Sequence, residues 1–361
     1  MAQAVGRLFR WRGTGLLRPS VLQSSQVRSY ASKTTIPTFS STSSPELDQA
    51  LDRFRQDLFI PHGLPRQQRL SMLKKRHAKR LENEPVTVFL NGEESYTFRH
   101  MDHADLPSKQ DAVNVLQMIK SPSDFKNLIP FLRGLHMSNI SLSPNRWEYL
   151  IRKAAKVDKL SLIIECARQS ERTGLTLKDK GIVRRLFFEI HRVAQEANFE
   201  GEKASHALGL AKHAVDLMDA PQHAVKDPEQ DPKCQPFVIG TLLELSAARA
   251  LNELGGQDEG SLVLNYAQKL IASWPRGHFQ NNVSKPVQID ERLQENLAIY
   301  NGIQMTLLVN GIALEKPVYN FFKGRVGQLK DVLKNQLEKC GSEAEQSGYT
   351  SNLLGRSLLK I

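Results

Sequence analysis

The sequence has little cysteine and lacks the short motifs that mark most enzymes. Only three of its 361 residues are cysteines, and none of them has the CxxC or Cys/His spacing of a zinc site. The patterns GxxxxGKS/T, GxGxxG, GxSxG and HExxH are typical of nucleotide hydrolysis, hydride transfer, serine hydrolysis and zinc proteolysis, and they do not occur. We therefore expect free thiols, no metal or cofactor, and no catalytic activity.

Long apolar runs are absent as well. No stretch of eighteen apolar residues exists, and the nearest candidate, residues 302–314, is interrupted by Gln304 and Asn310. A transmembrane helix needs about 20 predominantly apolar residues, so we expect no spanning helix. The apolar fraction of 40% and the charged fraction of 24% are those of a folded chain.

The first thirty residues contain no acidic residue. They carry five arginines, several serines and scattered apolar residues, which is typical of an amphipathic mitochondrial presequence. The sequence Arg28-Ser29-Tyr30 resembles a matrix-processing site, so we expect cleavage near Ala31 and a location in the mitochondrial matrix. Residues 31–45 are rich in serine and threonine and contain two prolines, which indicates a disordered linker.

The chain stays basic without this presequence. Its formal net charge is +11, and residues 1–30 account for five positive charges, which leaves +6. A surplus of this size favours an anionic partner. Nucleic acid and peripheral contact with a cardiolipin-rich membrane both fit, and charge alone does not choose between them.

Residues 145–180 contain two amphipathic helical patterns separated by a turn of three residues. Apolar residues recur three and four positions apart, as the buried face of a helix requires. Gly174 follows the second pattern, where a left-handed C-terminal cap is expected. A helical hairpin of this kind needs neighbours to bury its apolar face. The apolar positions are Trp147, Leu150, Ile151 and Ala154, then Leu160, Ile163, Ile164 and Ala167.

This stretch resembles a pentatricopeptide repeat nearly end to end, and a shift of 35 residues finds weaker, partly tetratricopeptide-like copies over residues 111–218. The resemblance implies an all-α solenoid of helical hairpins whose concave side lies on single-stranded RNA. Base-reading members of the family carry a small polar residue where Tyr149 and Arg184 stand here. The resemblance therefore implies recognition by shape and charge rather than by base sequence.

Residues 65–81 contain seven Lys and Arg residues and no acid between Arg66 and Arg80. A continuous helix would place five of these cations on one arc, opposite a stripe formed by Leu70, Leu73, His77 and Leu81. We expect the stripe to dock on the protein and the arc to meet RNA phosphates. The alternative is an ordinary solvated helix face. The candidate RNA-binding residues are Arg66, Arg69, Lys74, Lys75, Arg76, Lys79, Arg80 and Arg184.

A β-hairpin is predicted next, because residues 86–90 and 95–99 flank an Asn-Gly turn signal. The His- and Asp-containing run 100–105 lacks a further ligand at metal-binding spacing and indicates a turn. The predicted order of segments is presequence (1–30), linker (31–45), basic helical region with β-hairpin (46–110), pentatricopeptide-like repeats (111–220), loop (221–236), C-terminal helical hairpins (237–338) and weakly ordered tail (339–361).

Two functions fit these features. The first is a mitochondrial RNA-associated helical-repeat protein that acts in gene expression, either in mRNA maturation or stability, in translation, or on the ribosomal particle. The second is a scaffold that cradles a protein client, for instance an assembly factor for a respiratory complex. The basic arc favours the first function, because a scaffold for a protein does not need it.

Overall fold

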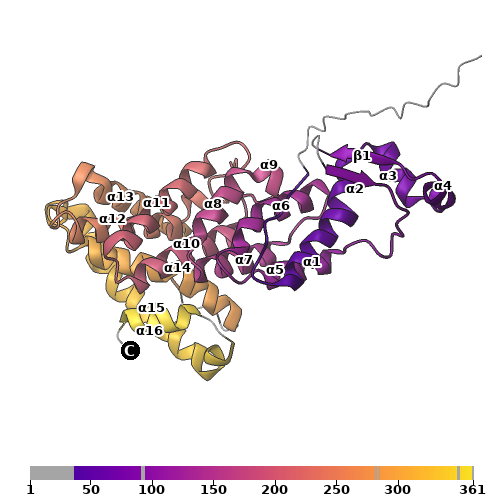
Figure 1. The fold of residues 1–361 in the computed structure, drawn as a ribbon. Helices are drawn as coiled ribbons and strands as arrows, with labels where there is room; N and C mark the ends of the chain where they lie inside the picture. Colours follow the sequence, from indigo (N-terminus) through magenta and orange to yellow (C-terminus); the bar gives the residue numbers. More distant parts are fainter. Residues whose placement is uncertain (1–35, 91–93, 281–282, 284, 348–349, 360–361) are drawn as a thin grey trace, which may run out of the picture.

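The computed structural model describes residues 36–90, 94–280, 283, 285–347 and 350–359. The predicted presequence, the first part of the predicted linker and the Asn-Gly turn lie outside these residues. Helices make up most of the described chain, and its one sheet has two strands (Figure 1). The predicted all-α helical-repeat class with a small β-hairpin is therefore confirmed.

The N-terminal unit combines short helices with the β-hairpin. A helix runs through α1, a π-helical turn and α2, and is followed by α3, α4 and the strands β1 and β2, in which Val88 pairs with Tyr96. These elements share a small core of their own. The bounds are Pro45–Phe54 (α1), Arg55–Phe59 (π-helical turn), Ile60–Gly63 (α2), Arg66–Leu73 (α3), Ala78–Asn83 (α4), Thr87–Leu90 (β1) and Glu94–Thr97 (β2).

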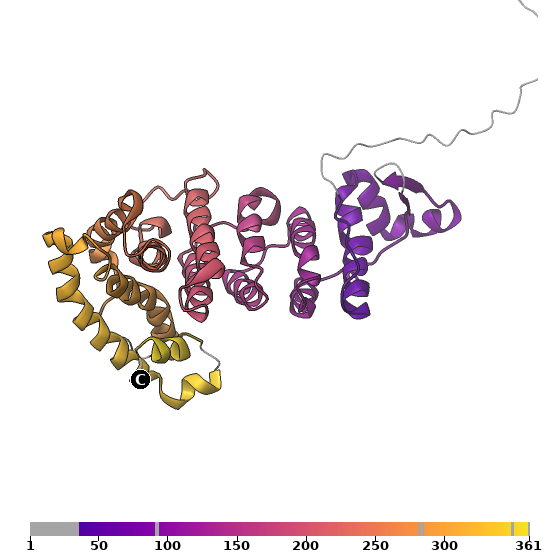
Figure 2. The same ribbon diagram turned by 60° about the vertical axis from the view of Figure 1, so that its left-hand side comes forward.

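The middle of the chain is a row of stacked helical hairpins (Figure 2). The first helix of one hairpin, α7, packs on the first helix of the next, α10, and the second helices α8 and α11 also pack on each other. This is how stacked repeats bury a continuous core. The bounds are Lys109–Met118 (α5), Leu128–Met137 (α6), Pro144–Lys156 (α7), Leu160–Arg168 (α8), Ser170–Thr173 (α9), Lys180–Glu196 (α10) and Gly201–Met218 (α11).

The hairpin predicted over residues 145–180 is confirmed in detail. Trp147 and Leu150 are buried, with 4% and 1% of their surface exposed, and Cys166 lies in the same core. Gly174 ends α9 with φ +78°, the left-handed cap that the sequence predicts. Asp158 in the intervening turn also has a positive φ, a conformation that Asp tolerates better than most residues.

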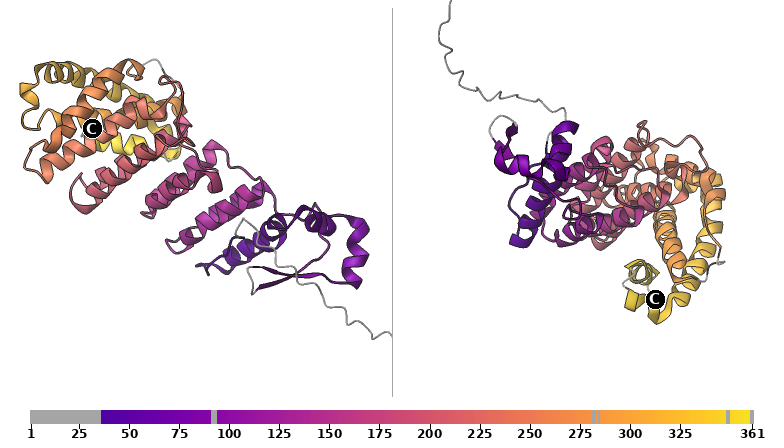
Figure 3. Two further views of the ribbon diagram at one scale, coloured as in Figure 1. Left: turned by 90° about the horizontal axis from the view of Figure 1, so that it is seen from above. Right: turned by 90° about the vertical axis from the view of Figure 1, so that its right-hand side faces the viewer.

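The C-terminal helices form a second core and turn away from the row (Figure 3). Here α14 packs closely along α12, because Gly302 has no side chain: a Cβ atom there would lie 3.0 Å from the backbone nitrogen of Glu244. The bounds are Pro236–Asn252 (α12), Leu262–Ser273 (α13), Pro286–Thr306 (α14), Lys316–Ser347 (α15) and Thr350–Leu359 (α16).

The end of the chain differs from the weakly ordered tail predicted for residues 339–361. The structure continues α15 to Ser347 and adds α16. Leu359 is buried in the C-terminal core, and Gly355 lets α16 approach α14 and α15, because a Cβ atom there would lie 3.1 Å from Leu337 and 3.3 Å from Leu297. These partners are far away in the sequence, so local composition does not reveal them.

Candidate nucleic-acid interface

The basic segment, residues 66–80, is not the single helix that the sequence predicts. Helix α3 ends at Leu73, Lys74 has an extended backbone with φ −89° and ψ 120°, and one 3-10 turn over residues 75–77 leads into α4. The carbonyl of Met72 would bond the nitrogen of Arg76 in a continuous helix. It instead accepts hydrogen bonds from the backbone nitrogen of Met101 and from Nδ1 of His100, both at 3.0 Å. Pairing with this distant segment interrupts the helix.

The interruption also changes which residues anchor the segment. Met72 and Leu81 are buried beneath the β-hairpin, whereas Leu70, Leu73 and His77 of the predicted stripe are only half-buried. Their core contains the residues Ile36, Ile60, Met72, Leu81, Leu90, Tyr96, Phe98 and Met101.

Polar contacts fix the β-hairpin to the π-helical turn between α1 and α2. Nη1 of Arg55 donates to Glu94 Oε1 over 2.6 Å, and this hydrogen bond lowers the pKa of Glu94. The hydroxyl of Tyr96 donates to the carbonyl of Gln56 over 3.0 Å, and burial raises the pKa of Tyr96 to about 12. The basic segment therefore packs on a β-hairpin that is itself held against the rest of the N-terminal unit.

Most cations of the basic segment face solvent. Arg69 is half-buried, and the other six are exposed. Nζ of Lys75 lies 3.8 Å from Oδ2 of Asp102, and Nε of Arg80 lies 3.8 Å from Oε2 of Glu84. Exposed pairs of this kind contribute about 0–1 kcal/mol and are screened by salt. The other four exposed cations are Arg66, Lys74, Arg76 and Lys79. Among the described residues, none of these four has an acidic partner within ion-pair distance.

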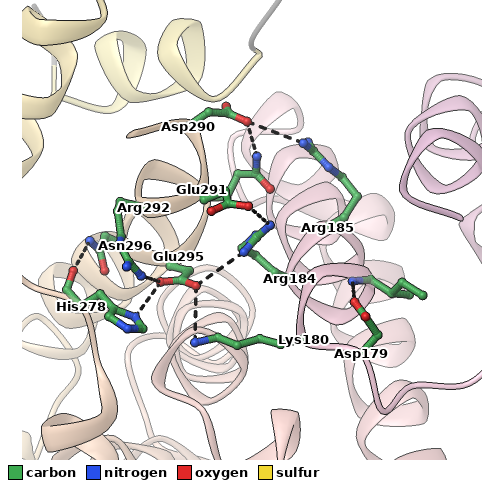
Figure 4. Close-up of polar contacts among 12 residues, drawn as sticks. Asp179, Lys180, Arg184, Arg185, His278, Asp290, Glu291, Arg292, Glu295 and Asn296 are labelled. Atoms are coloured by element: carbon green, nitrogen blue, oxygen red, sulfur yellow. Dashed lines mark hydrogen bonds and ion pairs between the residues drawn. The ribbon is translucent and has the colours of Figure 1, made fainter. Parts of the chain in front are cut away.

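Arg184 lies elsewhere, in contacts within the protein. Its side chain is only 11% exposed on α10, and Nη2 donates to Glu291 Oε1 of α14 over 2.8 Å. Nη1 lies 3.9 Å from Glu295 Oε1 (Figure 4). The structure does not bring Arg184 together with the basic segment, and its ion pairs give it a packing role that needs no RNA.

Glu295 is the centre of this ion-pair network (Figure 4). Its side chain is 6% exposed. Oε2 lies 3.0 Å from Nη1 of Arg292 and 3.2 Å from Nδ1 of His278, and Oε1 lies 3.7 Å from Nζ of Lys180. Burial alone would raise the pKa of Glu295, but the hydrogen bond from His278 and the neighbouring cations outweigh it and lower the pKa to about 2. Sequence reasoning missed this network. The signal was the pair of acids at positions 291 and 295, spaced to share one helix face.

Tyr149 is half-buried on α7 and contacts a lysine of the same helix. The ammonium group of Lys153 lies 5.6 Å from the centre of the Tyr149 ring, so the ring carries a cation–π contact within the protein. Nζ of Lys153 in turn donates to the carbonyls of Leu116 and Gln117 at the end of α5, over 2.9 and 2.6 Å.

One acid–base pair is sealed inside the fold. Nδ1 of His191 lies 2.7 Å from Glu244 Oε2, Asn301 donates to the other carboxylate oxygen over 2.6 Å, and burial raises the pKa of Glu244. Both side chains of the pair are 0% exposed, so no substrate reaches them. Within the described ranges, no three His, Cys, Asp or Glu side chains gather as metal ligands. No helix among these residues has the length and apolar character to cross a membrane.

The stacked hairpins and the exposed basic segment define a helical-repeat protein with a candidate nucleic-acid-binding surface. Comparison with known proteins gives the family. The family model described as "Mitochondrial ribosomal protein mS27" matches residues 22–354, and the chain therefore belongs to this family. The expected mitochondrial location is thereby confirmed. The family is one of ribosomal proteins and not of enzymes, in agreement with the missing catalytic motifs.

A curated relative supports the same assignment. The chain is similar to "Small ribosomal subunit protein mS27" of Neurospora crassa, with 28% identity over 260 residues. The alignment covers 66% of this chain and 65% of the relative, so the chain spans slightly less than two thirds of the relative's length. The likeness of residues 145–180 to a pentatricopeptide repeat stays a resemblance.

Proposed function

We propose that this chain is a structural component of the small subunit of the mitochondrial ribosome and that its basic segment contacts RNA there by shape and charge. Family membership and the name of the Neurospora relative support the ribosomal role. The observation that carries the RNA contact is the group of six exposed cations on a folded base, four of them without an acidic partner among the described residues.

The physical reason for RNA is counterion release. A cation that neutralises a phosphate frees a condensed counterion, so a cluster of unpaired cations gains affinity for a polyanion without reading its bases. Residues 66–80 contain no acid, so no ion pair three or four positions apart within the segment neutralises its cations. Tyr149 contacts Lys153 of its own helix and Arg184 pairs with Glu291, and neither residue type matches the family's base-reading positions, so we expect no base code.

Sedimentation of the tagged chain from mitochondrial lysate tests this proposal. We expect the wild-type chain to sediment with the small ribosomal subunit and to shift to lighter fractions after RNase treatment. A variant with Lys75, Arg76 and Lys79 changed to Glu is expected to leave the subunit. Its matched control changes three exposed lysines outside the segment, Lys109, Lys203 and Lys269, to Glu.

Both triple variants alter the net charge equally, so only the location of the change differs. If the wild-type chain does not sediment with the subunit, the ribosomal role is wrong. If the chain sediments but the two variants behave alike, the basic segment is not the RNA contact, and a protein client becomes the better explanation of the array.

A further inference from the structure

A second cationic feature lies in the C-terminal part of the molecule, at the other end of the array from α3 and α4 (Figure 2). It is a pocket of about 430 Å³ between the loop after α13, the start of α14 and α15. Pockets for small ligands typically measure about 300–1,000 Å³. Two arginines and one histidine line it, Arg292, Arg325 and His278, and the described lining residues include no acid.

The pocket has an aromatic wall. The rings of Trp274 and Phe279 stack with their centres 4.0 Å apart and their planes 20° from parallel, and Phe321 meets the edge of Trp274 at 5.4 Å. Gly277 allows this stacking, because a Cβ atom at that position would lie 2.1 Å from the Phe279 ring. A larger residue at position 277 would displace Phe279.

Both arginines of the pocket make contacts within the protein. Nη1 of Arg292 donates to Glu295 over 3.0 Å, and its side chain is 23% exposed. The guanidinium of Arg325 lies 5.5 Å from the centre of the Phe321 ring and donates to Gln328 over 2.8 Å. The amide of Asn296 donates to the carbonyl of His278 over 3.1 Å and fixes the loop (Figure 4). These contacts reduce the ordering that binding requires.

We propose that this pocket holds one unpaired nucleotide of an RNA, with its base against the Trp274–Phe279 pair and its phosphate at Arg292 and Arg325. Proteins that recognise single-stranded RNA stack bases on aromatic rings and bind phosphates with Arg forks. Both chemistries meet in this pocket. The inference rests on the proposed function for its partner, RNA. It adds a contact that binds a base as well as a phosphate, at a distance from the basic segment.

The test measures binding of the purified full chain to two labelled oligomers of equal length, a single-stranded oligouridylate and its abasic counterpart, by fluorescence anisotropy. The variant Arg325→Gln removes one phosphate contact, and Lys323→Gln, two positions earlier on the same helix and also exposed, removes an equal charge outside the pocket lining. We expect Arg325→Gln to weaken oligouridylate binding about tenfold, the change that loss of one hydrogen bond to a charged group produces. Lys323→Gln should leave it nearly unchanged.

Phe279→Leu separates base binding from phosphate binding. We expect it to weaken binding of oligouridylate and to leave the abasic oligomer unaffected. Equal effects of Arg325→Gln and Lys323→Gln on binding would overturn the proposal that this pocket holds a nucleotide. Equal wild-type affinity for the two oligomers would overturn it as well. These measurements need no ribosome, so failure of the sedimentation test overturns the proposed function alone.

Discussion

Arg184 of α10 donates to Glu291 of α14 across the boundary between the stacked hairpins and the C-terminal helices, with 2.8 Å between Nη2 and Oε1. The neighbouring Glu295 contacts three cations at the same boundary, Lys180, Arg184 and Arg292, and also the imidazole of His278. Arg185 continues the contact to Asp290 at 3.7 Å. The array and the C-terminal unit are therefore joined by buried ion pairs as well as by apolar packing, and this makes the junction sensitive to the loss of a single carboxylate.

Glu295→Gln should destabilise the protein strongly. It leaves Lys180, Arg184 and Arg292 without their shared counter-charge, and breaking a buried ion pair by removing one partner costs about 3–5 kcal/mol. Urea unfolding measures this loss. Glu291→Gln is the matched control, because Glu291 is 39% exposed and its partner Arg184 keeps Glu295 at 3.9 Å, so we expect a smaller loss. Equal losses in the two variants would show that Glu295 is not the centre of the network.

The contribution of Glu295 should also depend on pH. The pKa of Glu295 is lowered from 4.5 to about 2 in the folded protein. A lowered carboxyl pKa means that its stabilisation is complete above the unfolded pKa and is lost as the pH falls toward the folded pKa. The stability difference between wild type and Glu295→Gln should therefore be constant above pH 4.5 and shrink between 4.5 and about 2. A difference that did not change over this range would contradict the assigned pKa.

Trp147→Ala should unfold the array or lower its stability by about 3–5 kcal/mol, because a buried Trp leaves a large cavity. This is a large share of the total stability of a typical domain, about 5–15 kcal/mol. Thermal unfolding followed by circular dichroism measures the effect, and Trp147→Phe, which retains a large ring, should lose much less. A thermal midpoint equal to that of wild type would mean that Trp147 does not hold the hairpins together.

Gly174→Ala should destabilise the repeat, whereas Gly209→Ala should not. At φ +78° an alanine pays about 1–2 kcal/mol in backbone strain, and its Cβ would lie 3.1 Å from Nδ1 of His136. Gly209 lies within α11 and a Cβ there meets nothing within 4 Å, so alanine is expected to stabilise by about 0.4–1 kcal/mol. Unfolding in urea compares the two variants, and a stabilising effect at position 174 would rule out the left-handed cap.

Reversal of Lys75, Arg76 and Lys79 to Glu should weaken binding to mitochondrial RNA and reduce its salt dependence. The slope of log K against log salt concentration is negative, and loss of three phosphate contacts makes it less steep by about 2 for single strands. Wild-type binding should weaken steadily as salt rises, with little preference among sequences. A triple variant with full affinity and an unchanged slope would show that these residues do not meet RNA phosphates.

The hairpin over residues 145–180 could be predicted because its signals are local. Apolar spacing along Trp147, Leu150 and Ile151 sets the buried face, and Gly174 marks the end of the second helix whatever surrounds it. The basic segment shows where such reasoning fails. Its composition predicts one helix, but the carbonyl of Met72 accepts a hydrogen bond from the backbone nitrogen of Met101 instead of from that of Arg76. The residues around Met72 in the sequence do not reveal this distant partner.

The sequence by itself determined the α-helical class, the stacked hairpin and the surplus of exposed positive charge, because periodicity and composition act over a few neighbouring residues. The tertiary structure alone decided which cations stay free. Arg184 has the same chemistry as Arg66 and Arg76, yet a distant carboxylate on α14, that of Glu291, pairs with Arg184, whereas Arg66 and Arg76 lie in solvent. The folding of α16 and the joining of Trp274, Phe279 and Arg325 in one pocket likewise depend on packing between segments that no window of sequence contains.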